Sequence, residues 1–471
     1  MQKAAKRTEM DMTEGSLLGK IIRFALPLVA TGLLQVLYNA SDMIIVGNYS
    51  PSGSFSMGAV GACGALINLI VNLFMGLAVG VGICVAQAIG AKRYEDVHKL
   101  VHTAFSASLI CGIGVGIVGF VLAEPLLLLM GTPETVLVEA VPYMKAYFVG
   151  APAMLVYNFM AAALRSSGDS KRPLIFLSIA GLLNVATNIV MVVGFGLGAV
   201  GVGIATTVAQ YASVVMIVVY MSRMSGVCRF EIRRARIEAK QLVMIVRNGL
   251  PAGIQSTVFS ISNVLIQSTV NSYGDIVVAG NAAAGNIEGF VWVAMNAMHQ
   301  STLTVVGQNM GAGKMDRIKR ATLISVVCVA VIGLVMGLTI FALHEPLLSI
   351  YEPGDTAHNF AVREAGARRM AVISTTYFLC GIMDVLTGVL RGMGRSVLPM
   401  GTSIFTTCIL RIAWIFTVCP LFPNDIGVLY MSYPVTWMIS IAAHLSCCIV
   451  IYKKEKRLFE AKPTSFAPII E

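Results

Sequence analysis

Apolar segments long enough to cross a lipid bilayer recur along almost the whole chain. A membrane-spanning helix needs about 20 mainly apolar residues, and we identify twelve such segments in the 471-residue sequence. Hydrophobic residues make up 56% of the chain and charged residues only 12%, about half the charged share of an ordinary soluble domain. This composition predicts an all-α polytopic membrane protein. The expected spans are residues 21–46, 57–86, 99–121, 138–163, 173–194, 200–221, 242–270, 276–306, 321–343, 362–390, 399–419 and 428–451.

The second half of the sequence repeats the first. Three local patterns recur at displacements of 221 or 226 positions, and each copy has six expected spans. Both copies then have the same orientation, so we predict twelve transmembrane helices in two parallel-repeat six-helix bundles with a central cleft, as in secondary transporters. The paired patterns are Arg165-x-x-Gly168-x-Ser170-x-x-Pro173 and Arg391-x-x-Gly394-x-Ser396-x-x-Pro399, Glu124-Pro125-Leu126-Leu127 and Glu345-Pro346-Leu347-Leu348, and Gln87-x-x-Gly90 and Gln308-x-x-Gly311.

Basic residues are distributed unevenly over the loops. With both termini in the cytoplasm, 29 of the 34 lysine and arginine residues lie on the cytoplasmic side, whereas the outer loops 122–137 and 344–358 are acidic or neutral. This positive-inside pattern predicts a multi-pass protein of the cell membrane with both termini cytoplasmic. We expect the protein to be a monomer in the lipid bilayer.

The spans and loops divide the chain into five parts. We predict a cytoplasmic N-terminal segment at 1–20, an N-lobe six-helix bundle at 21–221 and a C-lobe six-helix bundle at 242–452, followed by a cytoplasmic tail at 453–471. The basic linker 222–241 joins the two lobes. We interpret its charge, part of a net charge of +10, as a membrane anchor rather than a nucleic-acid site.

Patterns that would indicate an enzyme or an ATP-driven pump are incomplete. Gly311-Ala-Gly313-Lys314 resembles the end of a P-loop, but the first glycine is missing and Met315 replaces the serine or threonine that would hold magnesium. The ten cysteines have no metal or redox spacing. A membrane-embedded enzyme would need a compact group of His, Asp or Cys, and His299 and His444 stand alone. We therefore predict no enzyme and no cofactor, and transport that is ion-driven or passive.

Ionisable side chains inside the expected spans are candidate functional residues, because a charge in hydrocarbon is costly. Asp42 lies in the outer half of the first span, near Gln35 and Asn39, and the alternative is simple solvation at the end of the span. Glu288 lies in the eighth span, where a structural hydrogen bond to a neighbouring helix is the alternative. Asp384 lies in the tenth span, where it could instead snorkel to the cytoplasm.

The ionisable residues do not follow the repeat. At a displacement of 226, Asp384 aligns with Asn158, and at 221 Glu288 aligns with Ile67. The two lobes should therefore have different functions. Arg411 lies in the middle of the eleventh span, where we expect it to pair with an acid of the same bundle, in a structural or a functional role. The cations that we expect to snorkel towards the outer face are Lys145, Arg363, Arg368 and Arg369.

Taken in order along the spans, several short patterns resemble the multidrug and toxic compound extrusion (MATE) transporters. The resemblance covers about residues 15–452, and it rests on the order and spacing of the patterns rather than on any one of them. The patterns are Leu26-Pro27 with downstream Asp42, Ala86-Gln87-x-x-Gly90-Ala91-Lys92, Leu164-Arg165-x-x-Gly168-x-Ser170-x-x-Pro173, Asn184-x-x-x-Asn188, and Gly198-x-x-Gly201-x-Gly203-x-Ala205-Thr206.

The resemblance implies an ion site in the N-lobe, at positions that match Asp42, Asn184, Asn188 and Thr206 of this chain. Asn188 departs from the family pattern, which usually has an aspartate there. A carboxylate pair that shares a proton is then absent, but one carboxylate with amide and hydroxyl oxygens still offers hard ligands for Na+, with Asp42, Asn184 and Thr206 as the candidate ligands.

Some MATE relatives use acids of the C-lobe instead, where Glu288 and Asp384 are available. The acid that certain relatives have in the seventh span is absent here, since that span offers only Gln255, Asn263 and Gln267. Asn158, Asn263 and Arg411 complete the set of supporting polar residues. Both lobes therefore remain candidates for ion coupling.

The resemblance implies an antiporter that exports lipophilic or cationic organic compounds in exchange for Na+ or H+ by alternating access. Small organic cations would be held by apolar side chains and one or more of the carboxylates. The main alternative is a flippase for a lipid-linked saccharide, which shares the broader superfamily and would need a cleft rich in Arg and Lys. The small and mixed set of charges within the spans argues against it, and a membrane-embedded enzyme is less favoured still.

Overall fold

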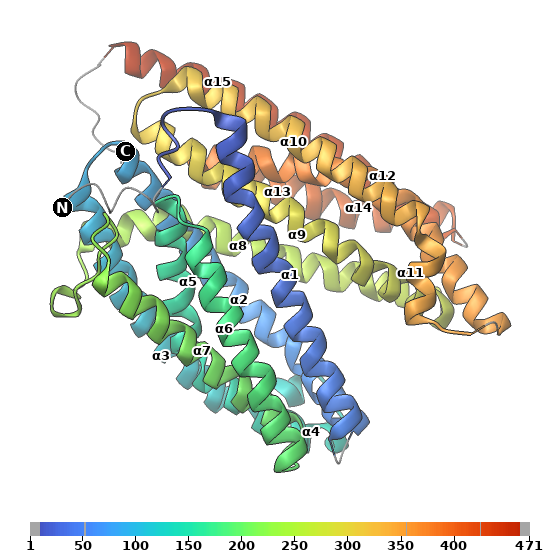
Figure 1. Cartoon of the computed structure of the whole chain (residues 1–471). Helices are drawn as coiled ribbons and strands as arrows, with labels where there is room; N and C mark the ends of the chain where they lie inside the picture. The colour runs from blue at the N-terminus through green and yellow to red at the C-terminus, as the bar shows by residue number, and fades with distance from the viewer. Residues whose placement is uncertain (1–9, 51–52, 355, 424, 462–471) are drawn as a thin grey trace. The chain divides into compact units, whose positions relative to one another are not determined.

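The chain is helical throughout the part that the structure describes. A computed structural model describes residues 10–50, 53–354, 356–423 and 425–461, and every regular element in these ranges is a helix or a helical turn (Figure 1). Within them, eleven helical segments are long and apolar enough to cross a membrane. The number is up to twelve if α4 (Glu134–Val149) and α5 (Ala151–Ser166), bent by 45°, form one span. The predicted all-α polytopic fold is confirmed.

Two compact units make up the fold, and two of the three boundaries between them fall inside long helices. These helices are α1 (Leu17–Tyr49) and α8 (Ala239–Asn271), and each contains a proline close to its boundary, Pro27 or Pro251. A proline removes one backbone donor from a helix interior, so each helix lacks a hydrogen bond near the place where it leaves one unit. The first unit contains Leu26–Gly253 with the described residues before Met12, and the second contains Met12–Ala25 with the described residues from Ile254 onward.

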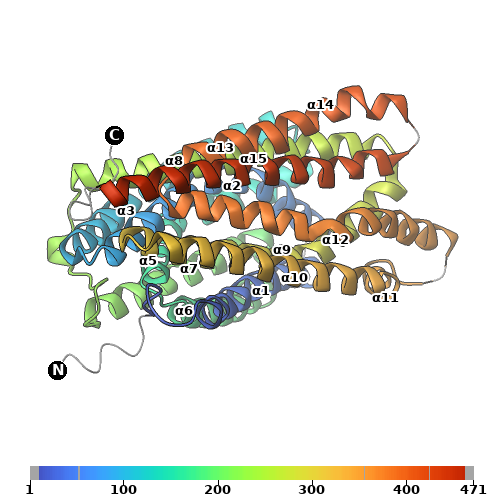
Figure 2. The same ribbon diagram turned by 90° about the horizontal axis from the view of Figure 1, so that it is seen from above.

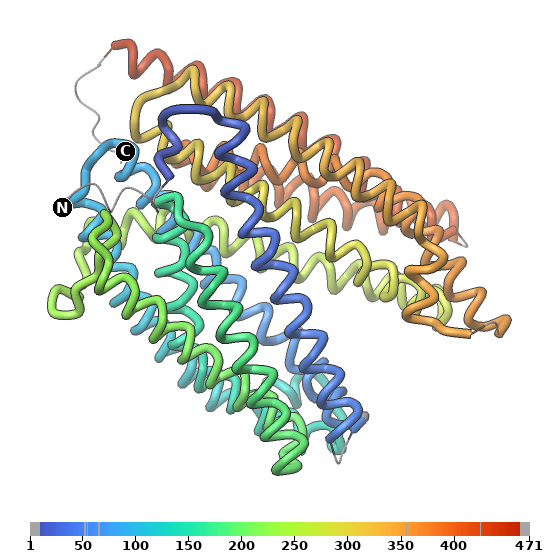
Figure 3. The backbone as a smooth tube through the Cα atoms, in the orientation of Figure 1, coloured from blue at the N-terminus to red at the C-terminus, as the bar shows by residue number. Residues whose placement is uncertain are grey.

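The first unit consists of helices that pack through small and aliphatic side chains. Its further elements are α2 (Gly53–Gly90), α3 (Tyr94–Leu129), α6 (Lys171–Asn188), the π-helical turn η2 (Ile189–Gly194), α7 (Gly198–Arg223) and the short 3-10 helix η3 (Ile232–Arg234). α3 packs against α4 and α5, and α7 packs against α4 and α6. Figure 3 traces α6 and α7 alongside each other. α6 also reaches α1, since the Tyr38 hydroxyl donates a hydrogen bond to the backbone carbonyl oxygen of Ser178.

The second unit is organised around its longest helices. Its further elements are α9 (Asp275–Gly311), α10 (Met315–Ala342), α11 (His344–Tyr351), α12 (Ala357–Gly392), α13 (Val397–Ser403), the π-helical turn η4 (Ile404–Ile409), α14 (Leu410–Thr417), the 3-10 turn η5 (Cys419–Leu421) and α15 (Ile426–Ala461). α12 is central, because it packs against α9, α10 and α15 (Figure 2). Side chains on the inner face of α12 are therefore surrounded by three other helices.

The sequence repeat is visible in the backbone. Gly168 and Gly394, at matching places of the repeated pattern, both have positive φ, at 90° and 80°. Lys92 and Gly313 form a second pair, with φ of 57° and 69°. A left-handed backbone conformation is strained for residues other than glycine. The first half nevertheless keeps this turn, with Lys92 in the left-handed conformation. Each unit also has one π-helical turn in its fifth span, and such turns often accompany functional sites.

The basic linker folds onto the first unit. Cys228 and Phe230 are fully buried, and the Phe230 ring lies 5.1 Å from that of His102 on α3. His102 accepts a hydrogen bond at Nε2 from the backbone N–H of Glu231 at 3.0 Å and donates one from Nδ1 to the carbonyl oxygen of His98 at 2.6 Å. The linker is therefore a packed segment, and His102, with both ring nitrogens hydrogen-bonded, is one of the residues that hold it.

Candidate functional site

Two helices of the first unit bring a carboxylate and two amides together. Tyr38 and Asp42 lie four residues apart on one face of α1, and Gly181, Asn184 and Asn188 share one face of α6. The ring of Tyr38 occupies the position that a Cβ on residue 181 would take, so the glycine allows the two helices to approach closely. Further along, Nδ2 of Asn188 donates a hydrogen bond of 2.5 Å to Oδ1 of Asp42.

This cluster offers oxygen atoms to a cation. Asn184 and Asn188 are buried and Asp42 is partly exposed. Nδ2 of Asn188 also lies 3.4 Å from Oδ1 of Asn184. Oδ1 of Asn188 is buried and has no hydrogen-bond partner among the described residues, which is costly for a polar atom. With the carboxylate of Asp42 it forms a pair of hard oxygen ligands that suits an alkali cation.

The other residues predicted for the N-lobe site are not hydrogen-bonded to this cluster in the described chain. Gln35 and Asn39 are exposed on α1, and Thr206 is half-buried on α7. Within the described chain, no hydrogen bond joins any of the three to Asp42. Asn158 on α5 donates from Nδ2 to the carbonyl oxygen of Met154 in its own helix, at 2.8 Å. The structure thus brings together Asp42, Asn184 and Asn188.

Glu288 forms a buried ion pair. Its Oε2 accepts hydrogen bonds from Nη2 of Arg369 at 2.7 Å and from Nε at 3.2 Å, and Nη1 of Arg369 donates to Oδ1 of Asn281 at 2.7 Å. The Glu288 side chain is 4% exposed and that of Arg369 is 14% exposed. The expectation that Arg369 snorkels towards the outer face is therefore wrong: α9 and α12 face each other here, and the carboxylate of Glu288 holds the guanidinium inside.

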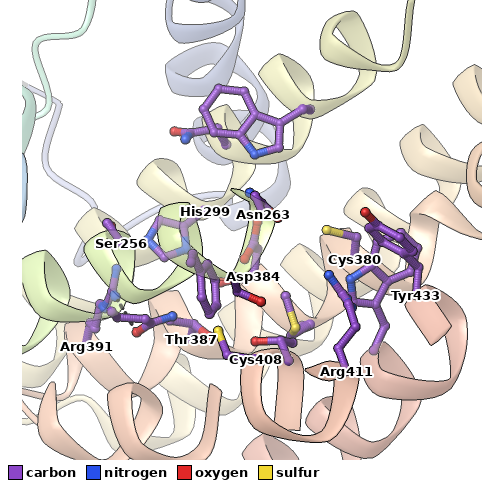
Figure 4. Close-up of a pocket in the computed structure, with 18 residues that line it drawn as sticks. Ser256, Asn263, His299, Cys380, Asp384, Thr387, Arg391, Cys408, Arg411 and Tyr433 are labelled. Carbon is purple, nitrogen blue, oxygen red and sulfur yellow. Dashed lines mark hydrogen bonds between the residues drawn. The ribbon is translucent and has the colours of Figure 1, made fainter. Parts of the chain in front are cut away.

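Asp384 lies at a cavity of about 290 Å³ within the second unit, between α8, α9, α12, η4, α14 and α15. The imidazole of His299, also at the cavity, donates from Nδ1 to the backbone carbonyl oxygen of Asp384 at 2.7 Å. The carboxylate itself makes no ion pair or hydrogen bond to a described residue, and Figure 4 shows it between Arg391 and Arg411 in that view. Asn263, predicted as a supporting residue, lines the same cavity.

Two arginines at this cavity have no carboxylate within ion-pair distance among the described residues. Arg411 is 6% exposed, donates from Nη2 to Oγ1 of Thr436 at 2.9 Å and lies 4.0 Å from the ring centre of Tyr433. Arg391 is 7% exposed and donates from Nη2 to Oε1 of Gln255 at 2.8 Å. In each, Nε is buried without a hydrogen-bond partner. The prediction that Arg411 pairs with an acid of its bundle is therefore wrong, since a hydroxyl and an aromatic face surround it.

The sequence reasoning missed Arg391 as a site residue. It counted this arginine among the cytoplasmic loop cations, because the expected span ends at residue 390. In the structure α12 continues to Gly392, and the side chain is buried in the last turns of the helix. The repeat gave no signal for this, since the matching Arg165 also lies outside its expected span, 138–163, and only the structure shows it inside α5. Trp292, Tyr433 and Trp437 are further lining residues that carried no sequence signal.

Comparisons with known proteins agree with this fold. The MatE family model matches residues 27–190 and 251–417, together more than two thirds of the chain. The probable multidrug resistance protein YoeA of Bacillus subtilis is 25% identical over 92% of this chain and 94% of its own length. The probable multidrug resistance protein YpnP of the same species is 26% identical over 85% of this chain and 88% of its own length.

Solved structures show the same fold. A MATE family transporter of the MOP superfamily, in an outward-facing conformation, matches with a TM-score of 0.88 over 96% of this chain and all of its own, at 20% sequence identity. Because the family model matches more than two thirds of the chain, the protein is neither a flippase outside the family nor an enzyme. The chain belongs to the MATE family of multi-pass membrane transporters.

Proposed function

We propose that this transporter exports drug-like organic compounds that are lipophilic or cationic, in exchange for Na+ or H+ by alternating access. The names of YoeA and YpnP support the substrate class, since both are described as probable multidrug resistance proteins. With both termini in the cytoplasm, as the distribution of basic residues predicts, export is movement of the compound away from the side of the termini.

Asp42 is the coupling residue in this proposal. The observation that carries it is the contact between Asp42 and Asn188 inside the membrane-spanning part of the first unit, with Oδ1 of Asn188 left without a partner. Na+ would gain the carboxylate and the free amide oxygen as ligands, and H+ would neutralise the carboxylate alone. Either ion removes the negative charge that an organic cation needs. Ion and substrate therefore compete, and an ion shifts the conformational equilibrium by its difference in affinity for the two states.

Glu288 is a poorer candidate for coupling. Its carboxylate is already compensated by Arg369 at 2.7 Å, so binding a cation there would first require breaking a buried pair. Asp384 makes no such pair, but two arginines share its cavity. Asp42 is the one of the three acids with an amide cluster and no cation among its hydrogen-bond partners in the described chain.

Dye efflux from proteoliposomes tests the proposal. Wild-type protein should export a cationic dye when a Na+ gradient or a pH gradient is imposed alone, and the effective gradient identifies the ion. Asp42→Asn should reduce gradient-driven efflux at least about tenfold, because a hydrogen bond or contact to a charged group is worth about 1.5–3 kcal/mol. Glu124→Gln, which removes an exposed acid of the same unit, should have no effect. Unchanged efflux by Asp42→Asn in correctly folded protein would place coupling elsewhere.

A further inference from the structure

The linker between the two lobes forms an arch, residues 231–238, over the first turns of α3. The backbone N–H of Glu231 donates a hydrogen bond to Nε2 of His102 at 3.0 Å. At the other end, the backbone N–H of Glu238 donates to Oγ1 of Thr103 at 3.1 Å. His102 and Thr103 are neighbours on α3, so this helix holds both ends of the arch. These two contacts use no arginine side chain of the linker, and they leave its cations available for other partners.

A cavity of about 450 Å³ lies between the arch and α3. Its lining carries four cations and two carboxylates, so its formal charge is +2 when both lining histidines are neutral. The charged lining residues are Lys99, Arg233, Arg234, Arg236, Glu95 and Glu238. Because cations outnumber carboxylates, an anion inside the cavity would be attracted from several sides.

The cations of this cavity can exchange their present partners for such an anion. No hydrogen bond or ion pair joins the side chain of Arg233 to a described residue, although this side chain lines the cavity. Arg234 pairs with Glu231 at 2.9 Å, and Lys99 pairs with Glu95 at 2.7 Å. Solvated pairs of this kind contribute little free energy, so a phosphate, with more charge than a carboxylate and three acceptor oxygens, can compete with them.

Two isoleucines of the arch are exposed beside these arginines. Ile232 is 68% exposed and Ile237 is 41% exposed, and they flank the arginine-containing stretch in the sequence. The membrane-spanning helix α8 begins at Ala239, directly after the arch. The arch therefore lies where the chain enters the bilayer. Exposed aliphatic side chains next to arginines suit the boundary between acyl chains and anionic headgroups.

We infer that the cavity between the arch and α3 binds the phosphate headgroup of one anionic phospholipid, with Ile232 and Ile237 against its acyl chains. The guanidinium of Arg233 presents a planar fork of donors that matches two phosphate oxygens, and the other lining cations add to the attraction. This is more than the general attraction of a basic linker to a membrane, because it assigns one lipid to one cavity. It does not depend on the proposed transport function.

Two lipids with the same acyl chains test the inference. Purified full-length protein in detergent is titrated with phosphatidylglycerol, which is anionic, or with phosphatidylcholine, which is zwitterionic, and native mass spectrometry measures the affinity for the first bound lipid. We expect phosphatidylglycerol to bind at least about fivefold more tightly. Arg233→Gln should weaken phosphatidylglycerol about fivefold, the effect of one basic residue near an anionic headgroup, and should leave phosphatidylcholine unchanged. Ile232→Ser should weaken both lipids.

Arg223→Gln is the matched control, because it removes an exposed arginine from the end of α7, beside the linker but outside the cavity. Its affinity for phosphatidylglycerol should equal that of the wild type. An equal loss in Arg223→Gln and Arg233→Gln would mean unspecific attraction and overturns the assignment of a site. Equal affinity of the wild type for the two lipids also overturns it. Glycerol phosphate provides the headgroup without acyl chains, and if it displaces the lipid at equal concentration, the ligand is a soluble phosphate and not a lipid.

Discussion

Removing one partner of the Glu288–Arg369 pair should destabilise the second unit strongly. For the 2.7 Å contact, the Coulomb energy is about 6 kcal/mol at an effective dielectric constant of about 20. Desolvation of the two ions offsets much of this gain, so the pair as a whole contributes little. Glu288→Gln keeps the desolvation cost of Arg369 and loses the attraction. The expected loss is about 3–5 kcal/mol in the free energy of unfolding.

A double-mutant cycle measures the coupling within the pair. Glu288→Gln, Arg369→Gln and the double variant are unfolded by titration with sodium dodecyl sulfate in mixed micelles, and tryptophan fluorescence reports the transition. The double variant should be more stable than the sum of the single losses predicts, by about 1.5–3 kcal/mol, because no unpaired charge remains.

The exposed pair Glu364–Arg368 provides the matched control. It lies on the same helix, with side chains 53% and 66% exposed, and a solvated pair of this kind couples by at most about 0.5 kcal/mol. If the coupling between residues 288 and 369 does not exceed that of the control pair, burial does not strengthen this interaction. An unpaired charge buried between α9 and α12 would then not be as costly as the low exposure of this pair implies.

Two smaller perturbations test other parts of the structure. Gly181→Ala should cost about 1–3 kcal/mol of stability and reduce gradient-driven efflux, because its Cβ would meet the Tyr38 ring and push α1 away from α6. Gly114→Ala is the control, since the space around its Cβ is open. Equal melting temperatures for the two variants would contradict the packing argument. His102→Ala should release the linker, since Glu231 and Phe230 both contact the imidazole. Maleimide labelling of buried Cys228 should then become faster. An unchanged labelling rate would mean that other contacts hold the linker.

The membrane-spanning fold could be predicted from the sequence because it depends on local composition. Each predicted span overlaps one observed membrane-spanning segment or the bent helix pair, with ends that differ by up to ten residues. The predicted span 173–194, for example, corresponds to Lys171–Gly194. The observed helices extend beyond the apolar residues, since backbone hydrogen bonds continue where the side chains become polar. The five-part division into lobes, linker and termini remains a prediction.

The contacts of the charged residues could not be predicted, because they depend on distant parts of the chain. Arg369 is buried only because Glu288 faces it, 81 positions earlier. Arg411 and Arg391 are buried beside hydroxyl, amide and aromatic groups, for which charge patterns give no signal. The grouping of Asp42 with Asn184 and Asn188 came from the family resemblance, and the structure adds the Tyr38–Gly181 contact that makes this grouping possible.

Simultaneous measurement of ion flux and dye flux in proteoliposomes tests the central claim most directly. Wild-type protein should move Na+ or H+ inward in step with outward dye movement, and each flux should fall when the other solute is withdrawn. In Asp42→Asn, any remaining dye flux should be independent of the ion gradient. Dye efflux that remains coupled to ion flux in this variant would contradict the assignment of Asp42 as the coupling residue.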